Sequence, residues 1–124
     1  MDLKALGGFC ALNLPTPVQK TTVVATNCEF AESNYGAVVE GSLTVATFND
    51  CIFSANQEDG IAGWESTVHL HGEATAVHSG ECGIVADQNC KVFVHLPAGH
   101  DTCYNNGWGD RVTSRGGSIT NVSA

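Results

Sequence analysis

The feature that most constrains the fold of this chain is a short internal repeat, with a period of roughly two dozen residues. The segment Asn27-Cys28-Glu29-Phe30 recurs one period later as Asp50-Cys51-Ile52-Phe53, and the same small-then-bulky alternation returns after a further period at residues 74–77. A repeat this short cannot bury its own apolar face, so it must stack on neighbouring copies of itself. The chain is therefore expected to continue one core along an axis, coil upon coil.

Each repeat holds about three segments with the composition of short strands. A glycine-led segment occurs at residues 36–39, 60–63 and 83–86, and another segment occurs at 42–45, 66–69, 90–93 and 118–121. These segments are rich in Val, Ile, Thr and Phe, and clusters of Gly, Asn, Asp and Ser separate them, which is typical of strands joined by turns. The pattern predicts an all-β parallel solenoid of about four to five coils, whose equivalent residues form ladders with a spacing of about 4.8 Å.

The repeat also predicts which side chains face inward. One expected ladder consists of Cys28, Cys51 and Thr75, and a second consists of Phe30, Phe53, Val77 and Tyr104. The two cysteines are expected to act as small core hydrophobes, because the alignment places no His beside either of them. The six cysteines include no Cys-x-x-Cys pair, and their number alone leaves their oxidation state open.

A length of 124 residues indicates a single domain. Residues 1–6 are expected to cover the first coil, residues 7–96 to form the repeating coils, and residues 97–124 to form an irregular last coil and a C-terminal cap. Such caps are expected because an uncovered terminal coil exposes apolar core and unpaired strand edges. The first residues fit a signal peptide poorly, and no apolar stretch reaches the length of a spanning helix, so no membrane insertion is expected and no compartment is indicated.

Two short motifs resemble those of a known family. Phe53-Ser54-Ala55-Asn56 is similar to the Phe-x-x-Asn element, and Gly7-Gly8-Phe9-Cys10 to the Gly-Gly-apolar element, of polymorphic outer-membrane-protein-type repeats. These repeats belong to the right-handed parallel β-helix fold of the pectin-lyase-like superfamily. The resemblance implies a right-handed β-helix over roughly residues 7–122. It also implies, for the enzymes of that superfamily, action on acidic polysaccharides.

The central coils are acidic throughout. Residues 21–90 hold ten Asp or Glu and no Lys or Arg, in a chain of formal net charge −8. Such a surface repels nucleic-acid phosphates and anionic lipids, so neither is an expected partner. The repeat aligns Glu40, Glu65 and Asp87 in a column after the glycine-led strand. This column is either a solvated acidic turn or a Ca²⁺ site, since Ca²⁺ takes paired carboxylates and turn carbonyls as ligands.

All five histidines fall within residues 69–100. His69 and His71 alternate on one strand face, and a shift by one period places His71 beneath His95. With Glu73 nearby, these side chains are of the types that bind zinc or copper. The alternative is a polar outer face that uses His without a metal.

Two tryptophans follow glycines on expected turns. Trp64 comes after Gly63, and Trp108 comes after Gly107. An exposed pair would stack on sugar rings or anchor a protein partner, whereas packing within the core or a cap is the alternative.

Together these features favour a non-catalytic structural or protein-interaction solenoid, such as an accessory or assembly subunit that presents an acidic face. A protein partner or larger assembly is the expected ligand, and no cofactor is required beyond the Ca²⁺ or Zn²⁺ that the two clusters would hold. The alternative is a carbohydrate-binding or carbohydrate-active β-helix, similar to polysaccharide lyases and hydrolases. Catalysis on uronates is disfavoured because it needs cationic groups that the central coils lack.

Overall fold

The computed structural model describes residues 3–6, 10–14, 19–72, 75–77, 79–95, 103–104 and 106–122, with side chains in 19–72, 79–95 and 106–122. These residues form strands and turns. The strands are β1 (Leu3–Leu6), β2 (Cys10–Leu14), β3 (Thr21–Thr26), β4 (Cys28–Ala31), β5 (Tyr35–Glu40), β6 (Thr44–Asn49), β7 (Ile52–Ser54), β8 (Ile61–Trp64), β9 (Thr67–His71), β10 (Thr75–Val77), β11 (Cys82–Asp87), β12 (Lys91–His95), β13 (Cys103–Tyr104), β14 (Gly109–Thr113) and β15 (Ser118–Asn121). Within the described ranges, no helix is long and apolar enough to cross a membrane.

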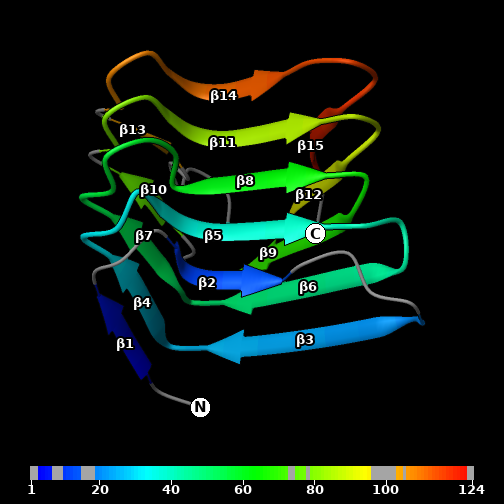
Figure 1. The fold of residues 1–124 in the computed structure, drawn as a ribbon, viewed down its shortest axis with the longest axis horizontal. Coiled ribbons are helices and arrows are strands. Elements are labelled where there is room, and N and C mark those ends of the chain that lie inside the picture. Colours follow the sequence, from blue (N-terminus) through cyan, green and yellow to red (C-terminus); the bar gives the residue numbers. More distant parts are fainter. Residues whose placement is uncertain are drawn as a thin grey trace.

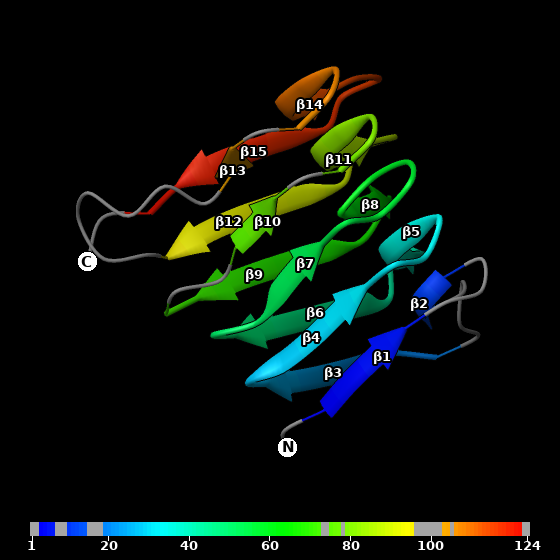
Figure 2. The same ribbon diagram turned by 90° about the vertical axis from the view of Figure 1, so that its left-hand side faces the viewer.

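Every third strand stacks in the same sheet, so the chain is a parallel β-solenoid as predicted. The three sheets have the orders β1-β4-β7-β10-β13, β2-β5-β8-β11-β14 and β3-β6-β9-β12-β15. Each turn of the chain thus adds one strand to each sheet, and every described strand pair is parallel (Figure 1). Figure 2 shows the sheet of β1, β4, β7, β10 and β13 in front, with the other two sheets enclosing the core beside and behind it.

The glycine-led strands pair in the predicted register. Ala37 of β5 lies opposite Ile61 of β8, and Ile61 lies opposite Ile84 of β11. The alignment of these segments by the sequence repeat is therefore confirmed for this sheet. Side chains alternate between the two faces of a strand, so this register sends all three residues into the core, where they are fully buried.

The predicted register is wrong by one residue between β7 and β10. Phe53 lies opposite Ala76 rather than Val77, and Thr75 lies opposite Ile52, so Thr75 does not continue the cysteine ladder. Residues 74–77 alternate only between small side chains and one Val, and such a segment specifies its register weakly. The other predicted pairing of Val77, with Tyr104, is confirmed.

The third sheet shows a different error, between β6 and β9. Val45 lies opposite Thr67, whereas the sequence alignment placed it opposite His69. The connection after β5 is longer than its counterpart after β8, and it closes with a hydrogen bond from the Thr44 N–H to the Gly41 carbonyl at 3.1 Å. Because the error is an even number of residues, the inward and outward faces of the strands are still those predicted.

The core is built around a group of aromatic rings. Phe30 and Phe53 occupy equivalent positions and stack with ring centroids 5.3 Å apart, and Phe48 of the third sheet meets Phe53 edge-on at 5.0 Å. All three are buried, and each contributes roughly 1.5–3 kcal/mol through removal of its apolar surface from water. Cys28 and Cys51 lie in the same core, which confirms their predicted role as small hydrophobes.

A buried asparagine explains the Phe-x-x-Asn motif. The side chain of Asn56 accepts a hydrogen bond from the Ser33 N–H at 3.2 Å and donates one to the Phe30 carbonyl at 3.3 Å. Both partners lie one coil earlier, at the corner between β4 and β5. Asn106 makes an equivalent contact two coils later, where its carbonyl oxygen accepts from the Ser79 N–H at 2.9 Å. Asn56 therefore joins successive coils where the chain turns.

Regular strands form within both of the expected terminal regions. Leu3–Leu6, within the expected N-terminal cap of residues 1–6, forms β1 and pairs with β4. The segment expected to be irregular contributes β13, β14 and β15, with Ser118 opposite Lys91, one residue from the predicted pairing with Cys90. The last described coil stays ordered because Ile119 packs against the core and because its turn is tied to the preceding coil by side-chain contacts of Asp87.

Candidate functional site

The predicted carboxylate column does not form, because a tryptophan separates two of its members. Trp64 lies opposite Glu40 on one side and opposite Asp87 on the other, while Glu65 belongs to the turn that follows. Glu40 and Asp87 are thus two coils apart, a separation of about 9.6 Å at the usual strand spacing. The strand register therefore corrects the alignment that left a solvated acidic turn and a Ca²⁺ site as the two alternatives.

Asp87 is also occupied by contacts within the protein. Its carboxylate accepts hydrogen bonds from Arg115, through Nε at 2.9 Å and a terminal nitrogen at 2.6 Å, and from the Ser114 hydroxyl at 2.9 Å. These donors, with Arg115 foremost, hold the pKa of Asp87 well below its usual range. Asp87 is a structural anchor for the last described coil.

The two tryptophans are not neighbours. Trp64 is half-buried at the end of β8, whereas Trp108 is 78% exposed in the turn that precedes β14. Because β8 and β14 run parallel in one sheet, the two rings lie at opposite ends of its strands. They do not form a shared platform.

A different acidic cluster forms at the corner between the first and second sheets. The Trp108 N–H donates to the Glu81 carbonyl at 2.7 Å, and the Glu81 N–H donates to the Glu58 carbonyl at 2.8 Å, so these three residues are stacked on successive coils. Asp59 follows Glu58 and accepts from the Cys82 N–H at 3.1 Å. We call Glu58, Asp59, Glu81 and Trp108 the acidic corner.

Electrostatic repulsion is built into the acidic corner. Burial, followed by the nearby charges of Glu81 and Glu58, raises the pKa of Asp59 to about 6. Burial, followed by the nearby charges of Glu58 and Asp59, raises the pKa of Tyr35. Three carboxyl groups are therefore held together at an energetic cost.

The second candidate site is a cluster of three histidines on the outer face of the third sheet. His71 of β9 lies opposite His95 of β12, as predicted, and their rings stack with centroids 4.3 Å apart and planes within 6°. Nδ1 of His69 lies 3.1 Å from Nε2 of His95. One ring nitrogen from each of the three residues lies within 4.8 Å of the other two. Glu73, the fourth ligand expected from the sequence, lies outside the described residues.

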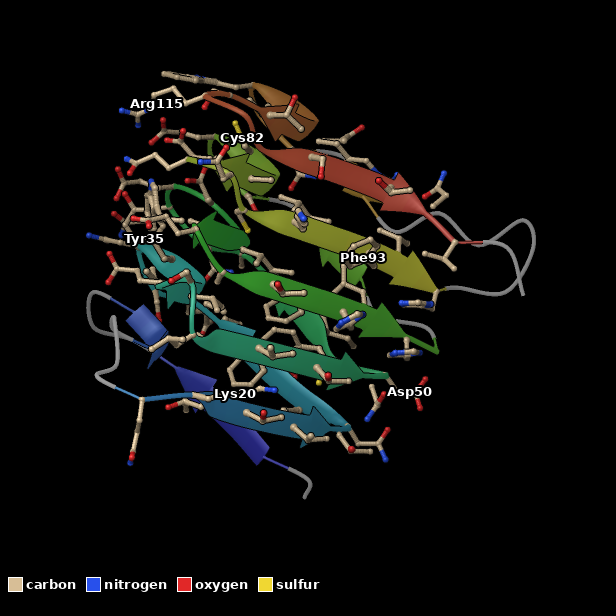
Figure 3. All side chains as sticks on the ribbon, turned by 90° about the vertical axis from the view of Figure 1, so that its right-hand side faces the viewer. Lys20, Tyr35, Asp50, Cys82, Phe93 and Arg115 are labelled. Carbon is tan, nitrogen blue, oxygen red and sulfur yellow. The ribbon has the colours of Figure 1, made fainter. Side chains whose placement is uncertain are left out.

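The histidine cluster is half-buried beside an aromatic ring. Phe93, which lies opposite His69, stacks on its imidazole with centroids 5.3 Å apart. Figure 3 shows Phe93 on the outer face of β12. Burial and the neighbouring imidazoles lower the pKa values of His69 and His71, which favours the neutral form with one nitrogen lone pair available.

The histidine cluster lies where the sequence repeat predicts it, whereas the acidic corner was not predicted. The signal was present in the alignment of Gly36, Gly60 and Gly83, because Glu58 and Glu81 each stand two residues before one of these glycines. The predicted column used Glu40, Glu65 and Asp87, which follow the glycine-led strands. The intervals between these three carboxylates differ from the intervals between the glycines, so they do not hold equivalent positions in successive coils.

Comparison of the chain with protein-family models, curated proteins and solved structures found no match.

Proposed function

We propose that this protein is a non-catalytic β-solenoid that binds a basic segment of a protein partner at the acidic corner. The observation that carries the proposal is the stacking of Glu58, Glu81 and Trp108 on three successive coils. This places two carboxylates and an exposed indole in one row. Carboxylates pair with Lys and Arg, and an indole face attracts the same cations.

The electrostatics of the corner support a cationic partner. Asp59 has a pKa of about 6 because its carboxylate is partly desolvated close to Glu81 and Glu58. A bound Lys or Arg would offset this repulsion. Binding would therefore recover the folding free energy that the charged carboxylates cost. Trp108 adds an apolar group of the kind that dominates protein interfaces.

The resemblance to pectin-lyase-like β-helices would instead make an acidic polysaccharide the ligand. Trp64 and Trp108 lie at opposite ends of their sheet and do not provide a common stacking surface for sugar rings. Residues 21–90 hold no Lys or Arg to pair with a uronate. We therefore favour the protein-binding role.

The test is a titration of the full chain with an oligolysine or oligoarginine peptide, followed by tryptophan fluorescence and calorimetry. We expect salt-dependent binding, weakened at least about tenfold by Trp108→Ala or by the double variant Glu58→Gln and Glu81→Gln, because each removes part of the row. The matched control is Glu40→Gln with Glu65→Gln, which removes the same charge from another corner.

Two outcomes would contradict the proposal. Equal weakening by both double variants would show that only net charge matters. Binding of oligogalacturonate in place of the basic peptide would favour the carbohydrate role instead.

A further inference from the structure

We propose that His69, His71 and His95 form a binding site for a divalent transition-metal ion that prefers imidazole ligands, Zn²⁺ or Cu²⁺. The site lies on the outer face of the third sheet, away from the sheet junction that holds the acidic corner. It is independent of the proposed peptide binding, because the two sites share no residue.

The backbone places the three imidazoles in a triangle. His69 and His71 are two residues apart on β9, so both project from the same face, and His95 stands opposite His71 on the adjacent strand. Neighbouring strands of a solenoid are held by continuous hydrogen bonding on both sides. The three Cα positions are therefore fixed before any ion arrives, and little ordering is needed for binding.

The nitrogen positions are close to those that a metal ion requires. Zn²⁺ binds imidazole nitrogen at about 2.0–2.1 Å, so two nitrogens in a tetrahedral site lie about 3.3 Å apart. The contact from His69 Nδ1 to His95 Nε2 is 3.1 Å, and the largest separation within the group is 4.8 Å at most. Binding would require the ring of His71, which now stacks on that of His95, to rotate toward the other two nitrogens.

A bound metal ion would also explain why three imidazole rings lie so close together. Three imidazoles are held together with one hydrogen bond between two of them, and this contact needs one ring to act as donor and the other as acceptor. A shared ion would satisfy a nitrogen of all three rings at once. The ring of Phe93 stacks on His69 and limits its rotation on one side.

Three protein ligands leave a fourth position for water or a small anion. Sites of this kind differ from closed structural sites, in which four side chains complete the coordination. The half-buried cluster lies on an outer face, so the fourth position is accessible from solvent. The chain's net charge of −8 favours the approach of a cation.

The test is isothermal titration calorimetry of the 124-residue chain with Zn²⁺ and with Cu²⁺, after purification in chelator and dialysis to remove the chelator. We expect one ion per chain and at least about tenfold weaker binding in each of His69→Ala, His71→Ala and His95→Ala, since each removes one of three ligands. The electron paramagnetic resonance spectrum of the Cu²⁺ form should show coupling to several nitrogens.

A second variant distinguishes the cluster from the other histidines, and the spectrum of the Co²⁺ form distinguishes it from the thiols. His78→Ala with His100→Ala removes the two remaining histidines of the chain and should leave the affinity unchanged. Circular dichroism in chelator checks that each variant is folded. The proposal is overturned if the wild-type protein binds neither ion, or if a variant with His69, His71 and His95 all replaced by Ala binds as tightly as wild type. It is also overturned if the Co²⁺ form shows a thiolate charge-transfer band.

Discussion

The guanidinium of Arg115 donates two hydrogen bonds to the carboxylate of Asp87 and thereby joins the last described coil of the solenoid to the one before it. Arg115 stands in the turn between β14 and β15, with a φ of 46°. Its carbonyl accepts from the Asn89 N–H at 3.1 Å, so the backbone and the side chain hold the same two turns together.

Arg115→Ala is expected to lower the thermal midpoint and to loosen β14 and β15 first, because Asp87 loses its bidentate partner. Arg115→Lys should recover only part of the loss, since an ammonium group cannot reproduce the paired geometry. Native-state hydrogen exchange checks which strands open. Uniform loss of protection across all coils would contradict an anchoring role.

The same contact predicts a pH dependence. The folded state holds the pKa of Asp87 below its unfolded value, so its contribution to stability is present above about pH 4 and is lost as the pH falls. Urea unfolding of wild type and Arg115→Ala should therefore differ at pH 7 and converge in acid. Parallel curves at every pH would rule this coupling out.

Asp59 is expected to act in the opposite direction. Its pKa of about 6 exceeds the ordinary value of 3.8, so the folded state binds the proton more tightly. The resulting stabilisation is complete below about pH 4 and is lost as the pH rises through about 6. Asp59→Asn keeps an oxygen to accept from the Cys82 N–H and removes the charge. It should raise the free energy of unfolding at pH 7 by roughly 1–3 kcal/mol.

Chemical denaturation of Asp59→Asn at pH 4 and pH 7 measures both parts of this prediction. Glu65→Gln is the control, because Glu65 is exposed at a different corner. A gain in stability of the same size at both pH values would contradict the assigned cause.

Asn56→Ala is expected to destabilise the fold by roughly 2–4 kcal/mol, because it leaves the Ser33 N–H and the Phe30 carbonyl buried without their side-chain partner. Asn34→Ala, at the same corner, keeps the backbone carbonyl that accepts from the Glu58 N–H and should cost much less. Equal losses for the two variants, measured by urea unfolding, would show that the amide contacts are unimportant.

Ile61→Lys and Ile84→Lys are each expected to unfold the protein. Both side chains are fully buried in one ladder, and an unpaired buried charge costs several kcal/mol against a total stability of roughly 5–15 kcal/mol. Ile52→Lys is the matched control, because Ile52 is 44% exposed on the outer face of β7. Circular dichroism should show loss of strand signal in the first two variants and none in the third.

The sequence by itself determined the solenoid, because a repeat of roughly two dozen residues with three strand segments has no way to bury its apolar side chains except by stacking. It also determined the inward ladders of Phe30 with Phe53 and of Ile61 with Ile84. It identified the pairing of His71 with His95, because the shift of one period between residues 66–69 and 90–93 is the shift by which β9 and β12 pair.

Only the tertiary structure decided the register where turns differ in length. Glu40, Trp64 and Asp87 share a column, and Glu58 stacks on Glu81, because strand hydrogen bonding sets these positions and residue type does not. The role of Asp87 could not be inferred either, since Arg115 is distant in sequence and reaches it only when the last described coil has closed on the one before. Outside β10 and β15, where the predicted register was wrong by one residue, local pattern specifies which face a residue occupies, while the lengths of the turns specify which residues meet across coils.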